Sequence, residues 1–368
     1  MGNSASASRA PTPGPRTAPK ALEDRTGTEI VSTEGSTNTV VAGVDLGDPG
    51  LAAVVRGRLG EVEDLLTSEL STGEDFLTEA ALHLAKAGGK RFRPLFTVLT
   101  SQYGPRPEDP EIITAAAVVE LVHLATLYHD DVMDEASMRR GAVSANSRWG
   151  NSVAILAGDF LFAHASRLVS TLGPDAVEMI AMTFAELVTG QMRETVGAKE
   201  GSDPVEHYLK VVREKTGSLI AASGRFGGTF SGADEAQTEC LWRLGDAVGT
   251  AFQISDDIID ISSVPDQSGK TPGTDLREGV HTLPVLYALR EEGADADRLR
   301  KLLDGPVTDD GVVAEALELL ERSPGMDKAK RKLGEYADRA RAELATLPAG
   351  PVTESLLRLV DYTVERVG

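Results

Sequence analysis

The chain has 368 residues, enough for one large or two medium domains, and 57 acidic against 37 basic residues give it a formal net charge of −20. This acidic excess argues against nucleic acid, or an anionic membrane surface, as the main partner. The single cysteine excludes an internal disulfide and suits a cytoplasmic protein. No uninterrupted apolar run approaches the roughly 18 residues of a spanning helix, so we expect a soluble protein.

The first segment differs in composition from the rest of the chain. Residues 1–46 are rich in Ser, Thr, Pro, Gly and Ala and contain few large apolar side chains. Such a segment buries too little surface to offset the conformational entropy that is lost on ordering. We therefore predict a disordered tail over 1–46 and one folded domain over 47–368.

Helical periodicity dominates the remainder of the chain. It begins at Asp48-Pro49, a residue pair typical of a helix start, and breakers such as Gly104-Pro105 and Gly173-Pro174 divide it. The predicted helices cover 51–70, 74–87, 92–103, 110–135, 151–172, 174–196, 204–230, 234–262, 280–291, 295–303, 310–322, 325–345 and 351–366. Because no segment shows the alternation of a strand, we predict an all-α fold, a large single-domain bundle with a central cavity.

A cationic turn precedes the helix predicted over 92–103. It reads Gly88-Gly89-Lys90-Arg91-Phe92-Arg93-Pro94. The glycines let backbone N–H groups approach an anion, and Lys90 and Arg93 are suited to clamping diphosphate oxygens. A basic surface turn is the alternative that these seven residues alone leave open.

The helix predicted over 110–135 ends in an aspartate cluster, Asp130-Asp-x-x-Asp134. Helical geometry puts His123, Asp130 and Asp134 on one stripe, with Thr126 beside it. Two carboxylates one turn apart suit magnesium, which takes one or two carboxylates together with water and phosphate oxygens. A solvated acidic helix end is the alternative.

A second copy of the pattern, Asp256-Asp-x-x-Asp260, ends another apolar stretch that is predicted to be helical. Two such clusters on core-facing helices would repel each other unless metal or a cationic ligand filled the space between them. A diphosphate with several magnesium ions would fill it. The two clusters together therefore predict a metal-dependent diphosphate site.

Further basic residues follow these clusters. Arg139 and Arg140 come directly after the first cluster, and we expect them to bridge phosphates rather than to neutralise the aspartates. Lys215-Thr216 has small neighbours, which favours a side chain that points into a cavity, with a surface lysine as the alternative. Lys270 lies in a Gly- and Pro-containing loop that is typical of a lid closing over bound phosphates and expelling water.

Taken together, these motifs resemble the trans-isoprenyl diphosphate synthases, the polyprenyl synthetase family. The resemblance runs from roughly residue 50 to the C-terminus, with Phe92 where the family commonly has Leu. It rests on the motifs Gly88–Pro94, Asp130–Asp134, Arg139-Arg140, Gly190-Gln191, Lys215-Thr216, Phe252-Gln253 and Asp256–Asp260. It implies an all-α prenyltransferase, usually a homodimer, that condenses isopentenyl diphosphate with an allylic diphosphate by ionisation, condensation and elimination.

The resemblance also implies roles by position. About three Mg²⁺ ions would bridge the allylic diphosphate, held by Asp130, Asp131, Asp134, Asp256, Asp257 and Asp260. The same diphosphate would contact Arg139, Lys215 and Lys270. Isopentenyl diphosphate would be bound by Gly89, Lys90, Arg93, His123 and Arg140. Thr216 and Gln253 would face the nascent carbocation.

The same resemblance places the floor of a chain-elongation cavity at Ala125 and Thr126, one turn before the first cluster. Both side chains are small and leave volume for a growing apolar chain, which an aromatic ring would fill. We therefore predict a long-chain all-trans polyprenyl diphosphate for a quinone side chain, and expect Ala125→Tyr to shorten it. A short-chain, geranylgeranyl-type synthase is the alternative.

Three other classes of protein fit the sequence less well. One is a plain magnesium- or diphosphate-binding helical module, which catalytic turnover would exclude. A class I terpene cyclase needs no isopentenyl diphosphate pocket, so Lys90, Arg93 and the complete second cluster disfavour it. A non-catalytic partner subunit of a heteromeric synthase would be expected to lack one aspartate cluster, and this chain has both. For the synthase we expect a cytoplasmic location, with transient membrane contact when the lipid-like product is released.

Overall fold

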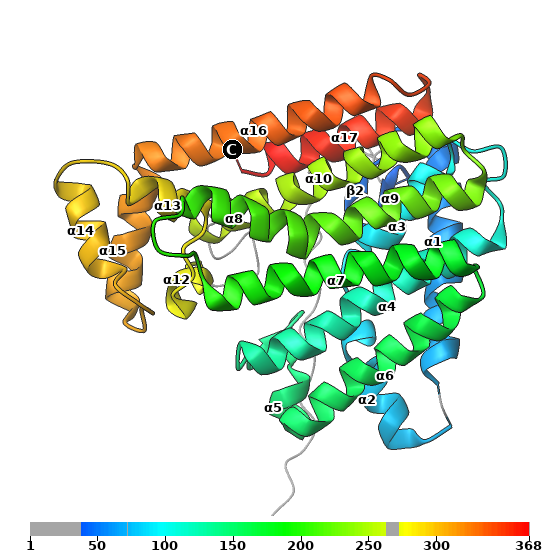
Figure 1. Ribbon diagram of the computed structural model, residues 1–368, viewed down its shortest axis with the longest axis horizontal. Coiled ribbons are helices and arrows are strands. Elements are labelled where there is room, and N and C mark those ends of the chain that lie inside the picture. Colours follow the sequence, from blue (N-terminus) through cyan, green and yellow to red (C-terminus); the bar gives the residue numbers. More distant parts are fainter. Residues whose placement is uncertain (1–37, 72, 263–271, 368) are drawn as a thin grey trace, which may run out of the picture. The chain divides into compact units, whose positions relative to one another are not determined.

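The computed structural model describes residues 38–71, 73–262 and 272–367, which belong to one compact unit (Figure 1). Most of the predicted tail lies outside the described residues, but its end is folded. Strands β1 (Val40–Val41) and β2 (Val44–Asp45) form an antiparallel hairpin. Val41, Val44 and Leu46 are buried against the core. The folded domain therefore begins before the predicted boundary at residue 47. Burial of three apolar side chains against the helices is enough to order this short segment.

Helices form most of the remaining structure, which confirms the predicted all-α class. Figure 1 shows α1 (Pro49–Leu70), α2 (Asp75–Lys86), α3 (Phe92–Ser101), α4 (Pro110–Met133), α5 (Ala145–Trp149), α6 (Asn151–Ser170), α7 (Pro174–Val196), α8 (Pro204–Val212), α9 (Ser218–Ser231), α10 (Glu235–Ser262), α12 (Thr274–Glu278), α13 (Leu283–Ala288), α14 (Ala294–Leu302), α15 (Asp310–Glu321), α16 (Pro324–Leu344) and α17 (Pro351–Glu365). Helices α5 and α12 were not predicted, because five residues are too few to show a helical period.

Two local features depart from the predicted pattern. The single helix predicted over 204–230 contains a π-helical turn, η1 (Arg213–Gly217), between α8 and α9. A second antiparallel hairpin joins β3 (Met138–Arg139) to β4 (Ala142–Val143). Strands of two residues are too short to show alternation, so the sequence did not indicate them.

Helix α4 is the central element of the fold. Its start follows from local chemistry, since the Asp109 carboxylate accepts the Glu111 N–H at 3.0 Å and Pro110 needs no hydrogen-bond partner there. Its apolar residues lie on all sides of the helix, as expected for a buried helix. It packs against α1, α3, α6 and α9.

Two helices in the described part of the chain, α4 and α6, are long and apolar enough to cross a membrane by length and composition. This differs from the expectation that no segment approaches that length, because a few charged residues interrupt the apolar runs without ending the helices. Within the most apolar window, 72% of α4 is buried inside the protein, as expected for a core helix. The corresponding share of α6 is 39%, so much of its apolar surface is left uncovered.

The core has three apolar parts, and the site lies where their helices meet. One part surrounds α4, a second joins α3, α10, α16 and α17, and a third lies between the end of α10 and helices α13–α16. Helix α9 packs against both α4 and α10. At Gly245 of α10 an added Cβ would lie 2.6 Å from the Ile220 carbonyl oxygen, so glycine permits the close approach of α9 and α10. The two helices that end in aspartate clusters are thereby held in one assembly.

Candidate active site

Both aspartate clusters line a single cavity of about 1020 Å³. Asp130 lines it from α4 and Asp134 from the residue directly after α4, while Asp256 and Asp260 line it from α10. The same cavity is lined by the predicted residues Gly89, Lys90, Arg93, His123, Thr126, Arg139, Arg140, Lys215, Thr216 and Gln253. Lys270, predicted to close over bound phosphates, lies outside the described residues.

The middle aspartate of each cluster does not line the cavity, whereas the prediction was that all six aspartates hold metal. Asp131 is fully buried, and its Oδ1 accepts a hydrogen bond from Arg139 Nε at 2.5 Å. Asp257 accepts hydrogen bonds from Gln253 Nε2 at 2.8 Å and from the Tyr208 hydroxyl. The physical reason is the helical repeat: residues i and i+4 share the cavity face, while residue i+1 lies about 100° round the helix.

The four carboxylates that line the cavity fit a magnesium site in which the bound substrate supplies some of the ligands. Among the described residues, no three carboxylate, imidazole or thiol groups come close enough to form a metal site by themselves. Magnesium does not require this, since one or two carboxylates with water and phosphate oxygens suffice. Burial raises the pKa of Asp130 to about 6, Lys215 opposes this shift and Asp134 adds to it. A cation near this pair would stabilise the two ionised carboxylates.

Arg139 contacts aspartates, contrary to the expectation that it would not neutralise them. Besides the bond to Asp131, its Nη2 lies 3.6 Å from Asp134 Oδ2. A fully buried carboxylate such as that of Asp131 requires a hydrogen-bonding partner, and the β3–β4 hairpin carries Arg139 to it. Arg139 still lines the cavity, and the ion pair fixes where its guanidinium lies.

The π-helical turn η1 positions Lys215 and Thr216. A π-helical turn inserts an extra residue into the helix and often marks a functional site. Lys215 Nζ donates to Glu194 Oε2 at 2.5 Å. Burial acts to lower the pKa of Lys215, but Glu194 and Asp130 more than compensate, so the pKa is raised and the lysine stays cationic. Gly190 of α7 allows this arrangement, since an added Cβ would lie 2.7 Å from the Lys215 backbone nitrogen.

A chain of hydrogen bonds orients the polar groups opposite α4. The Thr216 hydroxyl donates to Gln253 Oε1 at 3.1 Å, and Gln253 Nε2 donates to Asp257. Asp257 is held in turn by Tyr208, which the sequence did not single out. Burial raises the pKa of Asp257, and the two hydrogen bonds oppose that rise. Asp257 therefore fixes the amide of Gln253, and the amide fixes the hydroxyl of Thr216.

The cationic turn brings its charges to the same cavity. An added Cβ at Gly89 would lie 2.8 Å from the Arg140 guanidinium, and its φ of +134° is one that glycine adopts readily. Burial lowers the pKa of Arg93 to about 10, so the guanidinium remains protonated at neutral pH. Burial and the nearby arginines lower the pKa of His123 well below its usual value. Its Nε2 lies 3.4 Å from Arg140 Nη2, a donor, which leaves Nδ1–H of the neutral ring to donate elsewhere.

The two residues of the predicted floor lie differently. Thr126 lines the cavity, and its hydroxyl donates to the His123 carbonyl within the same helix, so its methyl group is free to face apolar chain. Ala125 is fully buried next to α6, where an added Cβ on Gly158 would lie 3.1 Å from the Ala125 carbonyl oxygen. Thr126 is therefore the residue of this pair that borders the cavity.

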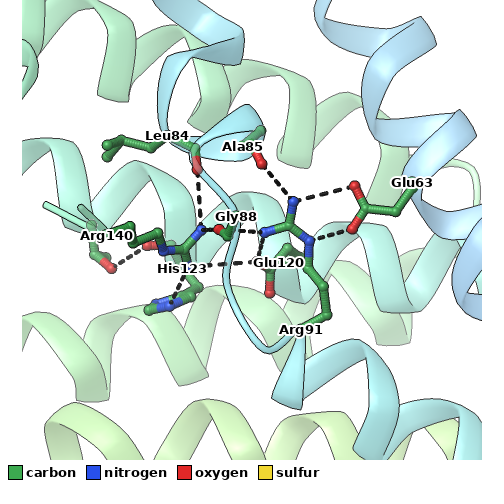
Figure 2. Close-up of polar contacts among 9 residues, drawn as sticks. Glu63, Leu84, Ala85, Gly88, Arg91, Glu120, His123 and Arg140 are labelled. Atoms are coloured by element: carbon green, nitrogen blue, oxygen red, sulfur yellow. Dashed lines mark hydrogen bonds and ion pairs between the residues drawn. The ribbon is translucent and has the colours of Figure 1, made fainter. Parts of the chain in front are cut away.

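Several cavity residues were not predicted from the sequence. Tyr362 lies on the C-terminal helix α17, and Arg366 directly follows that helix. Lys90 Nζ donates to the Tyr362 hydroxyl at 3.1 Å, and Arg366 Nη2 lies 2.8 Å from Asp256 Oδ1. Glu120 and Arg91 also line the cavity, in a buried charge cluster (Figure 2). Arg91 belongs to the Gly88–Pro94 turn, but the sequence suggested no role for it, and Glu120, Tyr362 and Arg366 belong to none of the motifs.

Comparison with known proteins gives consistent similarities. The family model described as Polyprenyl synthetase matches residues 74–320. The chain is 64% identical over 330 residues to a nonaprenyl diphosphate synthase from Mycobacterium tuberculosis, covering 90% of this chain and 98% of that protein. Among solved structures, a geranylgeranyl pyrophosphate synthase from Corynebacterium glutamicum, complexed with calcium and isoprenyl diphosphate, has a TM-score of 0.79 at 55% identity, covering 88% and 99% of the two chains. A decaprenyl diphosphate synthase from Rhodobacter capsulatus has a TM-score of 0.79 at 33% identity, covering 87% and 99%.

Proposed function

The chain belongs to the polyprenyl synthetase family and is a prenyltransferase, and we propose that it extends an allylic diphosphate with isopentenyl diphosphate to a long-chain all-trans polyprenyl diphosphate. The single observation that supports this most strongly is the shared cavity. Two carboxylate pairs, Asp130/Asp134 and Asp256/Asp260, line it together with two separate sets of cations. Two diphosphate substrates that react with each other need separate groups to bind each diphosphate within one cavity.

The cations divide by position. Arg139 and Lys215 are paired with acidic residues next to the first cluster, which suits the diphosphate that leaves as pyrophosphate. Lys90, Arg93, His123 and Arg140 gather around the Gly88–Pro94 turn, which suits the diphosphate that stays on the product. Family chemistry is generally magnesium-dependent, and we propose about three ions per site between the carboxylates and the first diphosphate. When bound, they neutralise the charge that develops on the leaving group.

The chain's own residues account for the remaining steps of the proposed reaction. Breaking the C1–O bond of the allylic diphosphate leaves a carbocation, which the hydroxyl oxygen of Thr216 and the amide oxygen of Gln253 would stabilise from the cavity wall. The double bond of isopentenyl diphosphate then forms the new C–C bond. A proton leaves the neighbouring carbon to give the new double bond, and the released pyrophosphate accepts it. Lys215 and Arg139 would hold that pyrophosphate in place until transfer is complete.

The length of the product is also part of this proposal. The nonaprenyl synthase relative and the small side chain of Thr126 at the cavity support a long chain for a quinone tail. The similarity to a geranylgeranyl pyrophosphate synthase structure supports the shorter alternative. The acidic net charge argues against a nucleic-acid partner, and the single cysteine suits a cytoplasmic enzyme, which would meet the membrane only as product leaves.

The experiment that tests the function is incubation with magnesium, labelled isopentenyl diphosphate and farnesyl diphosphate, followed by chain-length analysis of the dephosphorylated products. A ladder that ends at long polyprenols is the expected result. Products that stop after one or two additions would support the short-chain alternative. Absence of incorporation by folded protein would contradict the synthase and favour a non-catalytic partner subunit.

We also propose that the chain acts as a homodimer through α6 and α7. These helices pack side by side and expose large apolar residues. Leu156, Met182 and Met192 are 65%, 66% and 62% exposed. Exposed apolar side chains gathered on neighbouring helices mark an association surface rather than ordinary surface variation.

The double variant Leu156→Glu/Met182→Glu should convert the dimer to a monomer, because four like charges would meet across a two-fold interface that repeats the same patch. Light scattering coupled to size exclusion measures the mass. Val54→Glu, on the exposed surface of α1, is the matched control and should leave the mass unchanged. A double variant with the mass of the wild type would place the interface elsewhere.

A further inference from the structure

Glu120 is a buried carboxylate at the centre of the cationic side of the cavity. It lies on α4, three residues before His123, and its side chain is 2% exposed. Its Oε1 is 3.1 Å from Arg91 Nη1 and 3.8 Å from Arg140 Nη2 (Figure 2). The two arginines come from different segments, since Arg91 immediately precedes α3 and Arg140 lies in the turn of the β3–β4 hairpin. Glu120 therefore connects three separate elements at one point.

Both arginines have backbone conformations that need support. Arg91 has a φ of +46° and Arg140 a φ of +54°, in the left-handed region that non-glycine residues seldom adopt. Their guanidinium groups converge on the end of α2 and the turn that follows it: Arg91 donates to the Ala85 carbonyl at 2.7 Å, and Arg140 to the Gly88 carbonyl at 2.6 Å. Figure 2 shows this convergence, with Glu120 between the two side chains. The ion pairs with Glu120 help to hold both strained positions.

The balance of charge singles out Glu120 from its neighbours. Arg93, which is half-buried, also lies in this region, and Glu120 favours its charged form. Burial raises the pKa of Glu120, while Arg91, Arg140 and Arg93 oppose that rise by favouring the carboxylate. The other nearby acid, Glu63, pairs with Arg91 and is 44% exposed. Of the described carboxylates paired with these arginines, Glu120 is thus the buried one, and it offsets repulsion among three cations before a diphosphate arrives.

We propose that Glu120 is a positioning residue for isopentenyl diphosphate, acting by fixing the spacing between the Gly88–Pro94 turn and Arg140. The inference rests on the proposed function and deepens it, because it assigns to one residue the geometry of one of the two diphosphate subsites. Without the carboxylate, Arg91 and Arg140 repel each other and the start of α3 separates from the hairpin. Lys90 and Arg93 then no longer lie where they can bind the same diphosphate as Arg140.

The test compares Glu120→Gln with the matched control Glu63→Gln, which makes the same chemical change at the exposed partner of Arg91. In Glu120→Gln we expect the KM for isopentenyl diphosphate to rise at least about tenfold, with the KM for the allylic diphosphate within about threefold of wild type. Glu63→Gln should leave both constants within about threefold. Glu120→Asp, which keeps the charge on a shorter side chain, should fall between wild type and Glu120→Gln.

Calorimetric titration of isopentenyl diphosphate, without magnesium and without allylic substrate, provides a readout that does not require turnover. The same order of affinities is expected: wild type first, then Glu120→Asp, then Glu120→Gln. If Glu120→Gln fails to fold, Glu120→Asp carries the test, and unchanged affinity in it overturns the proposal. Equal losses for both substrates, or tighter binding in Glu120→Gln, would also overturn it. A wild-type protein that binds isopentenyl diphosphate but forms no product would contradict the proposed function and leave the binding test intact.

Discussion

Replacement of Asp130 or Asp256 by asparagine should lower kcat by about 1,000-fold or more, equivalent to about 4 kcal/mol of transition-state stabilisation. Asparagine keeps the size and one oxygen ligand but removes the negative charge that holds a hard cation. The two residues lie on different helices and line the same cavity, so each variant weakens the site from one side. Measurement of kcat against magnesium concentration should show partial recovery at high magnesium.

Two controls separate this effect from general damage to the protein. Asp64→Asn makes the same change on the exposed surface of α1 and should leave kcat unchanged. Thermal melting checks Asp256→Asn in particular, since that variant leaves the partly buried Arg366 without its carboxylate partner. A fully active Asp130→Asn enzyme with wild-type magnesium dependence would show that α4 does not contribute to the metal site.

Asp131 offers a contrast within the same cluster. Its carboxylate contacts Arg139 rather than the cavity, so its substitution acts on the position of a cation and not directly on the metal. The helical repeat puts Asp130 and Asp131 on different sides of α4, but the sequence alone does not show what Asp131 contacts. The direction of each side chain depends on which neighbour packs against that side of α4, and the hairpin that carries Arg139 was itself too short to be predicted.

The long elements and the cavity-facing aspartates could be predicted because their signals are local. A periodic apolar pattern marks α4 and α10, and i, i+4 spacing puts Asp256 and Asp260 on one face whatever the neighbours are. The same holds for the start of α4 at Asp109 and Pro110, where the cap depends on adjacent residues only. Local chemistry thus predicts which residues share a helix face.

The remaining site residues depend on contacts between distant parts of the chain. Arg366 is separated from Asp256 by 110 residues, and Lys90 from Tyr362 by 272. No spacing in the sequence therefore predicts either contact. In the sequence, Glu120 is a single charged residue in an apolar helix. Its role becomes evident only in the structure, where two arginines from other segments contact it. The π-helical turn at Lys215 likewise lies close against Gly190 of α7, a contact between separate segments that local helical propensity does not predict.

Thr126→Phe should shorten the product, shifting the end of the ladder from long polyprenols to one to three additions to farnesyl diphosphate. Thr126 borders the cavity one turn before Asp130, and Leu187 of α7 and Ile220 of α9 line the same cavity. A phenyl ring there occupies volume that the growing chain needs. Because the wall of the cavity is close-packed, it cannot move far enough to accommodate both the ring and the chain. The rate of the first condensation should stay within about threefold, since the ring lies away from the diphosphates.

Thr126→Val is the matched control, because it keeps the volume and removes only the hydroxyl, which is already bonded within α4. Its product lengths should equal those of the wild type. Ala125→Tyr, also expected from the sequence to shorten the product, starts from a fully buried position, so its ring must enter either the α4–α6 contact or the end of the cavity. The first lowers the melting temperature and the second shortens the product. Unchanged lengths in both Thr126→Phe and Ala125→Tyr would remove this turn of α4 from the control of chain length, and would move that control deeper between α6, α7 and α9.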